Sequence, residues 1–595
     1  MRILRYLPGA LAILCVLLIP PLVGHNIYYS GLAMEAATWA LANLGLTIIL
    51  GYTGQISLGQ AAFFGIGAYG AAVVATKTQS MWLGLLVAIA LSAVAGFIIG
   101  LSTLKMAGHY LAMVTIGFQT LISLVFNNWI TLTGGPDGIS GIPRPHIFGI
   151  SLMQNVPFLY FVFILLFLVA AGVNALRKYT WGRALRGIRE NELAANVMGV
   201  NAFRAKIVAF TVGATITGFA GGVFATGAMY ISPGLFDFNQ SVSFLAMTVV
   251  GGAGSAVGTI FGTVVLTLLP EVLRFMQHIY LVVYAIIVLL VVLGMPGGIW
   301  SVVEKWWARL VPPKRPKLDL QDIRFGVPTE SGEALLKLNG ISKSFGGLKA
   351  VDTVDLTLKS QEAHALVGPN GSGKTTVLNL VTGVYPLSGG TIELEGKSLT
   401  GLPSYRVTEN GIARTFQNIR LCKELTVLDN VMLGLHRHRK STFLGNMFSS
   451  PASRRERREF EEKAWKAIIY VGLADRAFEL AENLPHGQQK LVELARALVA
   501  EPKVLLLDEP AAGLNDTETA NLIQLLQRLK SQHVTILLIE HDMALVTKVA
   551  DKLTVLSFGQ RIAVGPVQEV LAEPVVLEAF LGRDKEEDQV VEAGG

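Results

Sequence analysis

Residues 368–376 read Gly-Pro-Asn-Gly-Ser-Gly-Lys-Thr-Thr, which fits the pattern G-x-x-x-x-G-K-[ST] in full. Glycines in such a loop let backbone N–H groups surround the phosphates of a nucleotide, and the helix that follows points its positive end at them. An apolar segment precedes the loop and another follows it, as a buried strand and a helix would. The stretch therefore predicts an α/β nucleotide-binding domain.

Each residue of this loop is a candidate contact for ATP. Lys374 would reach the β- and γ-phosphates as a point charge, and the hydroxyl of Thr375 would bind Mg²⁺. The candidate nucleotide-binding residues of the loop are Gly368, Pro369, Asn370, Gly371, Ser372, Gly373, Lys374, Thr375 and Thr376.

Charge is unevenly distributed along the chain. Its 595 residues exceed what one hydrophobic core usually supports, so two or more domains are expected. Residues 1–310 hold 15 Lys and Arg against 7 Asp and Glu, whereas the remainder holds 34 against 36. The positive excess therefore belongs to the hydrophobic half, where cations flank membrane spans on the cytoplasmic side. It does not indicate nucleic-acid binding. Cys15 and Cys422 are the only cysteines, so no disulfide framework is expected.

The first half of the chain consists of hydrophobic runs. Most of them reach the roughly 20 residues that cross a hydrocarbon core about 30 Å thick. A nucleotide-hydrolysing domain joined to such a bundle predicts an ATP-driven transporter. The runs occur near residues 8–24, 31–50, 58–76, 81–103, 109–130, 156–176, 205–230, 240–270 and 279–300.

Basic residues set the expected orientation. Arg2 and Arg5 place the N-terminus in the cytoplasm, and the dense basic loop after the sixth run belongs on the same side. The ATPase half must also be cytoplasmic, which requires an even number of crossings after that loop. Because Gly251-Gly252-Ala253-Gly254-Ser255 interrupts the run at 240–270, that run is expected to fold back as two short segments. About nine to ten crossings of the cytoplasmic membrane result.

Two further features of the membrane half are functional candidates. Glu35 lies about one turn inside the second run, where an ionisable residue either serves transport or reaches the interface. Residues 182–206 are expected to form a short amphipathic, basic helix in a cytoplasmic loop, ending at Gly199.

The composition divides the chain into four parts. We expect a helical polytopic membrane domain at 1–310, a linker at 311–332, an α/β nucleotide-binding domain at 333–585 and a polar tail at 586–595. Proline and charge mark the linker, which follows Trp306 and Trp307, two expected anchors at the membrane interface.

Two adjacent acids end the apolar segment 504–507. Asp508 would hold Mg²⁺ through water, and Glu509 would polarise the attacking water as a general base. Such a pair also occurs at solvated strand ends, but the phosphate-binding loop upstream favours the catalytic interpretation.

With these residues in place, the soluble half resembles the ABC ATPase family along residues 335–585. The resemblance implies that Phe345 stacks on adenine, that Gln417 binds Mg²⁺ and moves against the membrane domain, and that His541 contacts the γ-phosphate. It implies catalytic roles for Glu509, His541 and Gln417, and Mg²⁺ ligation by Thr375, Gln417 and Asp508.

Within that family, the chain resembles most the uptake transporters of hydrophobic (branched-chain) amino acids. Its signature segment reads Leu484-Pro485-His486-Gly487-Gln488-Gln489, and an insert after Gln417 carries Phe443-Leu444-Gly445 ahead of a helix. Residues 51–61, 108–112 and 133–138 resemble the permease of the same family. Leu193-Ala194-Ala195 followed by Gly199 partly matches the E-A-A-x-x-x-G coupling loop of ABC importers.

The signature departs from the family pattern. In ABC dimers the signature of one subunit closes on the nucleotide of the other, and here Pro485 replaces the usual serine, while Asn515 stands where aspartate is usual. Helix-end N–H groups near Gly487 and Gln488 would still donate to the nucleotide. We expect this chain's own ATP to be hydrolysed, and the site that borrows its signature to be slower.

A complete transporter has two permease and two ATPase domains, and this chain supplies one of each. The resemblance implies a second permease subunit, a second ABC ATPase subunit and an extracytoplasmic solute-binding protein; a homodimer is the alternative. The expected function is ATP-driven import of branched-chain amino acids. Import of urea or short amides, an exporter half-transporter and a membrane-tethered regulatory ATPase are the other hypotheses.

Overall fold

The computed structural model describes residues 7–102, 109–144, 146–147, 150–295, 297–310, 325 and 333–581, which separate into two units. The first comprises Met1–Arg189, Ala202–Arg315 and Ser441–Ser453, and the second comprises Glu190–Asn201, Pro316–Lys440 and Arg454–Gly595. Each half of the sequence therefore contributes one short segment to the other unit. The predicted linker (apart from Phe325), the predicted tail and Arg2 and Arg5 lie outside the described residues.

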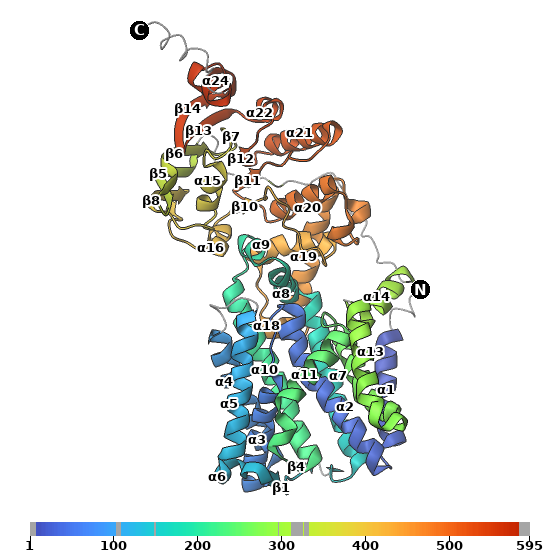
Figure 1. Ribbon diagram of the computed structural model, residues 1–595. Coiled ribbons are helices and arrows are strands. Elements are labelled where there is room, and N and C mark those ends of the chain that lie inside the picture. Colours follow the sequence, from blue (N-terminus) through green and yellow to red (C-terminus); the bar gives the residue numbers. More distant parts are fainter. Residues whose placement is uncertain are drawn as a thin grey trace. The chain divides into compact units, whose positions relative to one another are not determined.

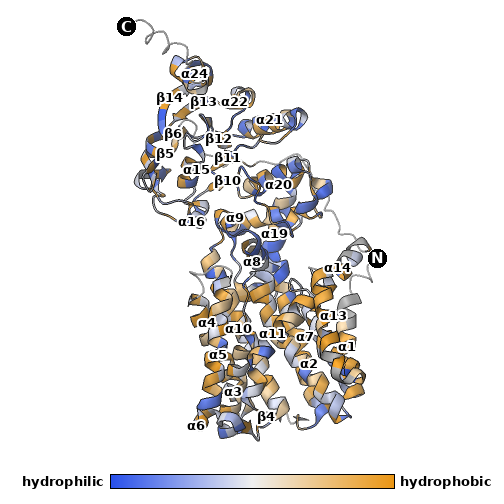
Figure 2. Ribbon diagram, in the orientation of Figure 1, coloured by the Kyte–Doolittle hydropathy of each residue, from blue (hydrophilic) through white to orange (hydrophobic). Residues whose placement is uncertain are grey.

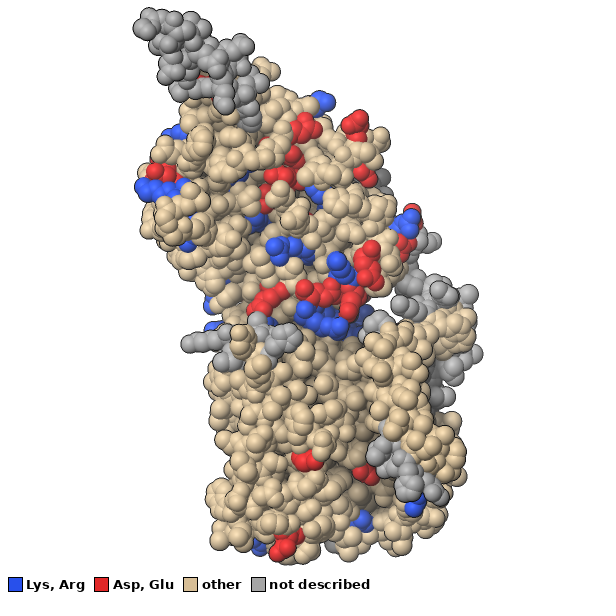
Figure 3. Space-filling model, in the orientation of Figure 1, with Lys and Arg blue, Asp and Glu red and all other residues tan. Residues whose placement is uncertain are grey.

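The first unit is built of apolar helices (Figure 2). Each predicted hydrophobic run contains at least one helix. Among the described residues, six helices are long and apolar enough to cross a membrane by length and composition, and α1 and α13 contain shorter apolar stretches. On the face drawn in Figure 3 this unit is mostly uncharged, as expected where lipid replaces water. The principal helices are α1 (Leu7–Val23), α2 (Ile27–Leu46), α3 (Gln60–Thr78), α4 (Met81–Ser102), α5 (His109–Asn128), α7 (Asn155–Lys178), α10 (Ala202–Ala228), α11 (Phe238–Gly251), α12 (Ala256–Val272), α13 (Tyr280–Gly294) and α14 (Ile299–Leu310).

Small residues bring the central helices of this unit together. Helix α10 packs against α2, α3 and α4. Gly67 of α3 and Gly218 of α10 lie so close that a Cβ on Gly67 would clash with the backbone of Gly218. Because lipid tails are as apolar as the helices, such close backbone packing replaces the hydrophobic effect as the source of association.

The predicted interruption of the run at 240–270 is confirmed. Helix α11 ends at Gly251, Gly252 has a φ of +112°, and α12 begins at Ala256. The side chain of Ser255 caps α12 by accepting a hydrogen bond from the backbone N–H of Gly258 at 3.4 Å. The glycine-rich stretch therefore separates two helices that pack against each other.

The segment 182–206 is helical up to the region of Gly199, as predicted, but the prediction of one continuous helix is wrong. The segment forms α8 (Thr180–Glu190) and α9 (Glu192–Val197), and α10 begins at Ala202. Asn191 separates the first two: its φ is −152°, and its side chain accepts a hydrogen bond from the N–H of Ala194 at 2.9 Å. Asparagine competes for backbone donors in this way, so it starts a new helix more readily than it continues one.

The second unit contains a six-stranded sheet and a four-stranded sheet (Figure 1). The larger sheet has the order β10-β11-β12-β7-β13-β14, in which only β14 runs antiparallel to its neighbour. The smaller sheet, β6-β5-β8-β9, is antiparallel. The strands are β5 (Ala334–Phe345), β6 (Leu348–Lys359), β7 (Ala363–Val367), β8 (Gly389–Leu394), β9 (Lys397–Ser398), β10 (Ile412–Arg414), β11 (Val504–Asp508), β12 (Thr535–Ile539), β13 (Lys552–Ser557) and β14 (Gln560–Pro566).

The parallel strands bring the predicted site residues together at one edge of the larger sheet. Strands β7, β11 and β12 are buried along their whole length and lie side by side. Parallel strands end at the same edge of a sheet, so the residues after them meet there. The helices of this unit are α9, α15 (Lys374–Val381), α16 (Ser404–Glu409), α17 (Val427–Leu433), most of α19 (Pro451–Tyr470), α20 (His486–Leu498), α21 (Asp516–Ser531), α22 (Met543–Val549), α23 (Val567–Leu571) and α24 (Pro574–Leu581).

Candidate functional site

The phosphate-binding loop joins β7 to α15. Gly368, Gly371 and Gly373 have φ values of +150°, +83° and +97°, a backbone region that a side chain rarely adopts. Lys374 is the first residue of α15, and its Nζ donates to the carbonyl oxygens of Gly368 and Pro369, each at 2.8 Å. The loop thus curls around its own lysine at the positive end of the helix, the geometry that receives phosphate.

Burial lowers the pKa of Lys374, while the nearby charges of Glu509 and Asp508 act in the opposite direction. The ammonium group is therefore short of solvation and already close to the two acids at the end of β11. A polyanionic phosphate chain would supply the missing counter-charge.

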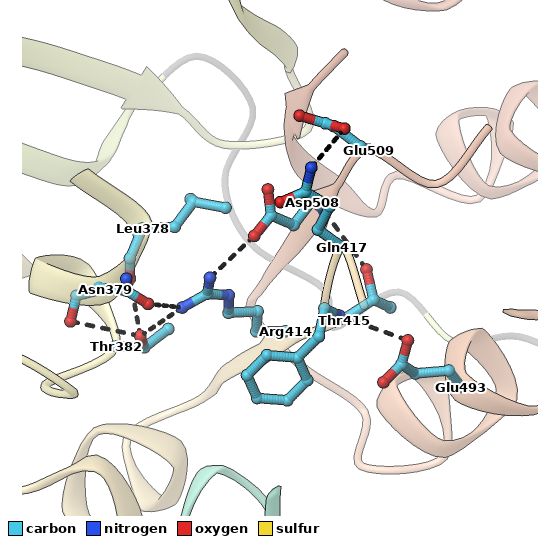
Figure 4. A network of polar contacts seen from close by, with 10 residues as sticks. Leu378, Asn379, Thr382, Arg414, Thr415, Gln417, Glu493, Asp508 and Glu509 are labelled. Atoms are coloured by element: carbon cyan, nitrogen blue, oxygen red, sulfur yellow. Dashed lines mark hydrogen bonds and ion pairs between the residues drawn. The ribbon is translucent and has the colours of Figure 1, made fainter. Parts of the chain in front are cut away.

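A buried ion pair holds the first of these acids. Arg414, at the end of β10, donates from Nη2 to Oδ2 of Asp508 at 2.8 Å and from Nη1 to Oδ1 of Asn379 at 2.7 Å (Figure 4). The side chains of Arg414 and Asp508 are 2% and 1% exposed, respectively. Burial raises the pKa of Asp508, and the positive charge of Arg414 offsets part of that effect.

The other oxygen of Asp508 fits a metal ion. Oδ1 is buried and has no hydrogen-bond partner among the described residues. Buried carboxylate oxygens are rarely left unsatisfied, and hard cations such as Mg²⁺ prefer oxygen ligands. The described residues contain no cluster of three His, Cys, Asp or Glu that would hold a metal unaided. An ion here would therefore need hydroxyl, amide, water or phosphate oxygens as well, which suits Mg²⁺ bound with a nucleotide.

Two side chains converge on the second acid. Nε2 of Gln417 donates to Oε2 of Glu509 at 2.9 Å, and Nε2 of His541 lies 3.2 Å from Oε1 (Figure 4 shows the glutamine contact). Glu509 itself has a φ of +48°, and its N–H donates to the carbonyl of Ile539 at 2.9 Å. A non-glycine residue held in this strained region points to a functional constraint on the direction of its side chain.

The structure brings the phosphate loop, Gln417, Asp508, Glu509 and His541 to one edge of the large sheet. Phe345 lies at the end of β5, where its half-exposed ring packs edge-on against Tyr385 at 5.3 Å between centroids and beneath Nζ of Lys343. One exposed aromatic face is consistent with the predicted stacking on a base.

The predicted signature residues belong to a different part of the unit. Gly487 and Gln488 lie in the first turn of α20, for which Pro485 is the N-cap. A Cβ on Gly487 would meet the carboxylate of Glu518, so this end of α20 packs against α21. No hydrogen bond between the signature and the phosphate loop occurs in the described part of the chain. That the signature serves the nucleotide of another subunit stays a prediction.

Sequence reasoning missed the residues that position this site. No role was predicted for Arg414, although it holds Asp508. Glu493, buried in α20, accepts hydrogen bonds from the N–H groups of Phe416 at 3.4 Å and Arg420 at 3.2 Å, and so fixes the loop on both sides of Gln417. The available signal in the sequence was an acid between the apolar pairs Leu491-Val492 and Leu494-Ala495.

The Gln417 loop also contacts α9. Val197, Met198 and Phe416 form a small buried apolar cluster, with Leu193 and Val384 packed against it. Helix α16 also contacts α9, because the hydroxyl of Thr408 donates a hydrogen bond to the carbonyl of Val197 at 2.7 Å. Gly199 ends α9 with a φ of +83°. Residues from the partial coupling-loop match are therefore packed directly beside the loop that carries Gln417.

Comparison with known proteins agrees with this geometry. The family described as "Branched-chain amino acid transport system / permease component" matches residues 28–293, and the family "ABC transporter" matches residues 351–512. The chain is 43% identical over 249 residues to the "High-affinity branched-chain amino acid transport ATP-binding protein BraF" of Pseudomonas aeruginosa, covering 42% of this chain and 98% of that protein.

Two further relatives match one half of the chain each. The "High-affinity branched-chain amino acid transport ATP-binding protein LivG" of Escherichia coli is 42% identical over 251 residues, covering 42% of this chain and 98% of LivG. The "High-affinity branched-chain amino acid transport system permease protein LivM" of Salmonella typhimurium is 32% identical over 314 residues, covering 49% of this chain and 71% of LivM.

The chain is therefore an ABC transporter component, a multi-pass membrane protein with a cytoplasmic ATPase domain that hydrolyses ATP in a reaction coupled to transport. Within that class it belongs to the family of branched-chain amino-acid-type permeases and ATP-binding proteins, with both components in one polypeptide.

Proposed function

We propose that this chain is a fused permease–ATPase subunit of an importer of branched-chain amino acids in the cytoplasmic membrane. The observation that carries the proposal is that its two halves match, independently, an ATP-binding protein and a permease named for branched-chain amino acid transport. The break between α11 and α12 supports a transport role for the helical unit, because interrupted helices are where transporters expose backbone groups to a solute.

The site residues have distinct roles in this proposal. Lys374 and the backbone N–H groups of the phosphate loop bind and orient ATP. Glu509 accepts the proton of the attacking water, held for that purpose by Gln417 and His541. Thr375, Gln417 and Asp508 would hold Mg²⁺, which neutralises charge that develops on the phosphates.

Transport needs ATP to favour one conformation over another, which it does by binding the closed ATPase dimer better than the open one. Movement of the Gln417 loop and of α16 on closure displaces α9 through Phe416 and Thr408, respectively. Because only the short loop 198–201 joins α9 to α10, that displacement reaches the helical unit through the chain itself. Partner subunits complete the dimer, and a solute-binding protein delivers the amino acid.

ATPase activity in lipid, measured with co-purifying partners, tests the proposal. Leucine, isoleucine, valine, urea and short amides are offered in turn, each with its cognate solute-binding protein. We expect stimulation by protein loaded with a branched-chain amino acid and its loss in Glu509→Gln. Stimulation only by the binding proteins for urea or short amides would show that the transporter imports those solutes and not branched-chain amino acids. Indifference to every binding protein, with stimulation by lipids or hydrophobic drugs, would instead support an exporter.

A further inference from the structure

The segment Ser441–Ser453 interrupts the nucleotide-binding half of the sequence but belongs to the unit of apolar helices. It reads Ser-Thr-Phe-Leu-Gly-Asn-Met-Phe-Ser-Ser-Pro-Ala-Ser and contains no charged residue. The segment includes the short helix α18 (Phe443–Met447) and the first residues of α19. We refer to it as the uncharged insert.

The uncharged insert satisfies its polar groups internally. Asn446 is fully buried, and its Nδ2 donates to Oγ of Ser441 at 2.8 Å and to Oγ of Ser453 at 3.0 Å, which ties the two ends of the insert together. The hydroxyl of Thr442 caps α18 by accepting from the N–H of Gly445 at 3.0 Å. A loop whose polar side chains point inward is suited to surroundings that offer few hydrogen bonds.

The insert packs on the membrane helices through one face. The backbone N–H of Trp181 donates to Oδ1 of Asn446 at 3.0 Å, and its indole N–H donates to the carbonyl of Ser441 at 3.3 Å. The Trp181 ring meets Phe443 edge-on, with 5.5 Å between centroids. On α7, a Cβ added to Gly172 would lie 3.1 Å from Cγ of Met447, so glycine is what allows the insert to lie against this helix.

The position of that contact along α7 gives its depth in the membrane. Helix α7 ends with Arg177 and Lys178 in its last turn, the basic residues that mark the cytoplasmic interface. Gly172 precedes Lys178 by six residues, and a helix rises about 1.5 Å per residue, so the contact lies about 9 Å inward from the basic end. That is the depth at which interfacial helices place their apolar side chains, about 5–10 Å into the headgroup and acyl boundary.

The opposite face of the insert is apolar and uncovered. Leu444 and Phe448 are 56% and 76% exposed. They are four residues apart, Leu444 in α18 and Phe448 at its C-cap, a spacing that places both on one side of this turn. The sequence on either side is basic: Lys440, Arg454 and Arg455 are exposed and immediately flank the insert. Apolar side chains bordered by exposed cations are the composition of a segment that enters a leaflet with anionic headgroups.

We propose that the uncharged insert is a lipid-binding element, with Leu444 and Phe448 inserted into the cytoplasmic leaflet and the flanking cations beside anionic headgroups. The depth along α7 and the flanking positive charge favour lipid over a second protein subunit as the occupant of this face. The nucleotide-binding half of the sequence thereby has a contact of its own with the bilayer, beside α7.

Site-specific labelling of the full chain tests the proposal. In a Cys15→Ser background, which leaves the buried Cys422 in place, Phe448→Cys or Leu444→Cys is labelled with an environment-sensitive nitrobenzoxadiazole and reconstituted in phosphatidylcholine–phosphatidylglycerol bilayers. We expect a blue-shifted emission that doxyl-labelled lipids quench and aqueous iodide does not. Phe558→Cys, at an exposed turn of the nucleotide-binding unit, is the matched control and should behave in the opposite way.

Photo-crosslinking separates the possible occupants without relying on the label. A benzophenone amino acid at position 448, in membranes that also contain the co-expressed subunits, should yield lipid adducts. Adducts with another polypeptide, together with shielding from both quenchers, would overturn the proposal in favour of a subunit interface. Quenching by iodide equal to that at position 558 would overturn it in favour of a water-exposed loop.

Discussion

The side-chain amide of Gln417 donates a hydrogen bond of 2.9 Å to the carboxylate of Glu509. Gln417 follows strand β10 and Glu509 follows strand β11. The amide is thereby held beside the proposed general base, and His541 approaches the same carboxylate from another strand end at 3.2 Å. A glutamate fixed from two sides has a defined direction before any substrate arrives, which is what proton transfer at a fixed atom requires.

The first prediction concerns Glu509→Gln. An amide cannot accept the proton of the attacking water, so we expect ATP hydrolysis to fall by about 10²–10⁴-fold, the usual contribution of a general base. ATP binding should be retained, because the phosphate loop is unchanged. Steady-state ATPase assays and nucleotide-binding measurements check this, with Glu569→Gln, exposed in the first turn of α23, as the control that should keep its activity. Equal activity of Glu509→Gln and the unsubstituted chain would remove Glu509 from the mechanism.

A second prediction separates nucleotide binding from folding at Lys374. Lys374→Met should weaken ATP binding roughly tenfold to one-hundredfold, since a hydrogen bond to a charged group contributes about 1.5–3 kcal/mol. The apparent melting temperature without nucleotide should not fall, because burial already lowers the pKa of this ammonium group and its removal relieves that cost. Lys397→Met, on the exposed strand β9, is the control for loss of a positive charge. A large loss of stability with unchanged ATP affinity would contradict the proposed role.

A third prediction follows from the raised pKa of Asp508. Because the folded-state pKa lies above the unfolded value of about 3.9, the stabilisation by this carboxyl is full below that value and is lost as pH rises through the folded pKa. Asp508→Asn keeps an oxygen for Arg414 and does not ionise. We therefore expect the stability of the variant relative to the unsubstituted chain to improve as pH rises from about 4. Melting temperatures in EDTA across pH check this; a difference that is constant with pH would show that burial does not perturb Asp508, and Asp516→Asn serves as an exposed control.

Local patterns in the sequence predict the parts of this protein whose structure depends on neighbours along the chain. The loop at 368–376, the acids after 504–507 and the glycine-rich break at 251–255 are set by turn geometry and apolar periodicity, and each predicted element is present. The helix predicted within 182–206, ending at Gly199, is not continuous because a single residue, Asn191, offers its side chain to the backbone and restarts the helix.

What could not be predicted depends on tertiary contacts. Arg414 and Asp508 are adjacent because β10 and β11 pair in the sheet, a neighbour relation that no local pattern specifies. The uncharged insert is equally unforeseen: its lack of charge is visible in the sequence, but its place among the membrane helices depends on Gly172 and Trp181, far away in the chain.

The buried pair of Arg414 and Asp508 gives a fourth prediction. Arg414→Met would leave the carboxylate buried without its counter-ion, and breaking a buried pair in this way typically costs about 3–5 kcal/mol. Arg476→Met removes a comparable contact, 2.8 Å from Glu479, at an exposed site, where ion pairs contribute about 0–1 kcal/mol. Melting temperatures of the two variants should therefore differ clearly. Similar losses in both would mean that the Arg414 pair is no more than a surface contact in energetic terms.

The last prediction concerns coupling between hydrolysis and transport. Thr408→Val removes the hydroxyl that donates to the carbonyl of Val197, so α9 loses its hydrogen bond to α16 while the residues around the phosphates stay in place. We expect basal ATPase activity to be unchanged and stimulation by a loaded solute-binding protein to fall severalfold, because α16 then moves without displacing α9 and only the apolar contact with Phe416 remains.

Thr547→Val is the matched control for that variant. Its hydroxyl donates to the carbonyl of Met543 within α22, at 2.6 Å, so the same kind of bond is lost away from α9. Stimulation should survive in this variant. If Thr408→Val lowered basal and stimulated activities in equal proportion, its effect would lie in the ATPase itself, and α9 would not carry the coupling. If instead only the stimulated activity fell, the contacts of α9 with α16 and Phe416 would be the point at which the ATPase moves the membrane helices.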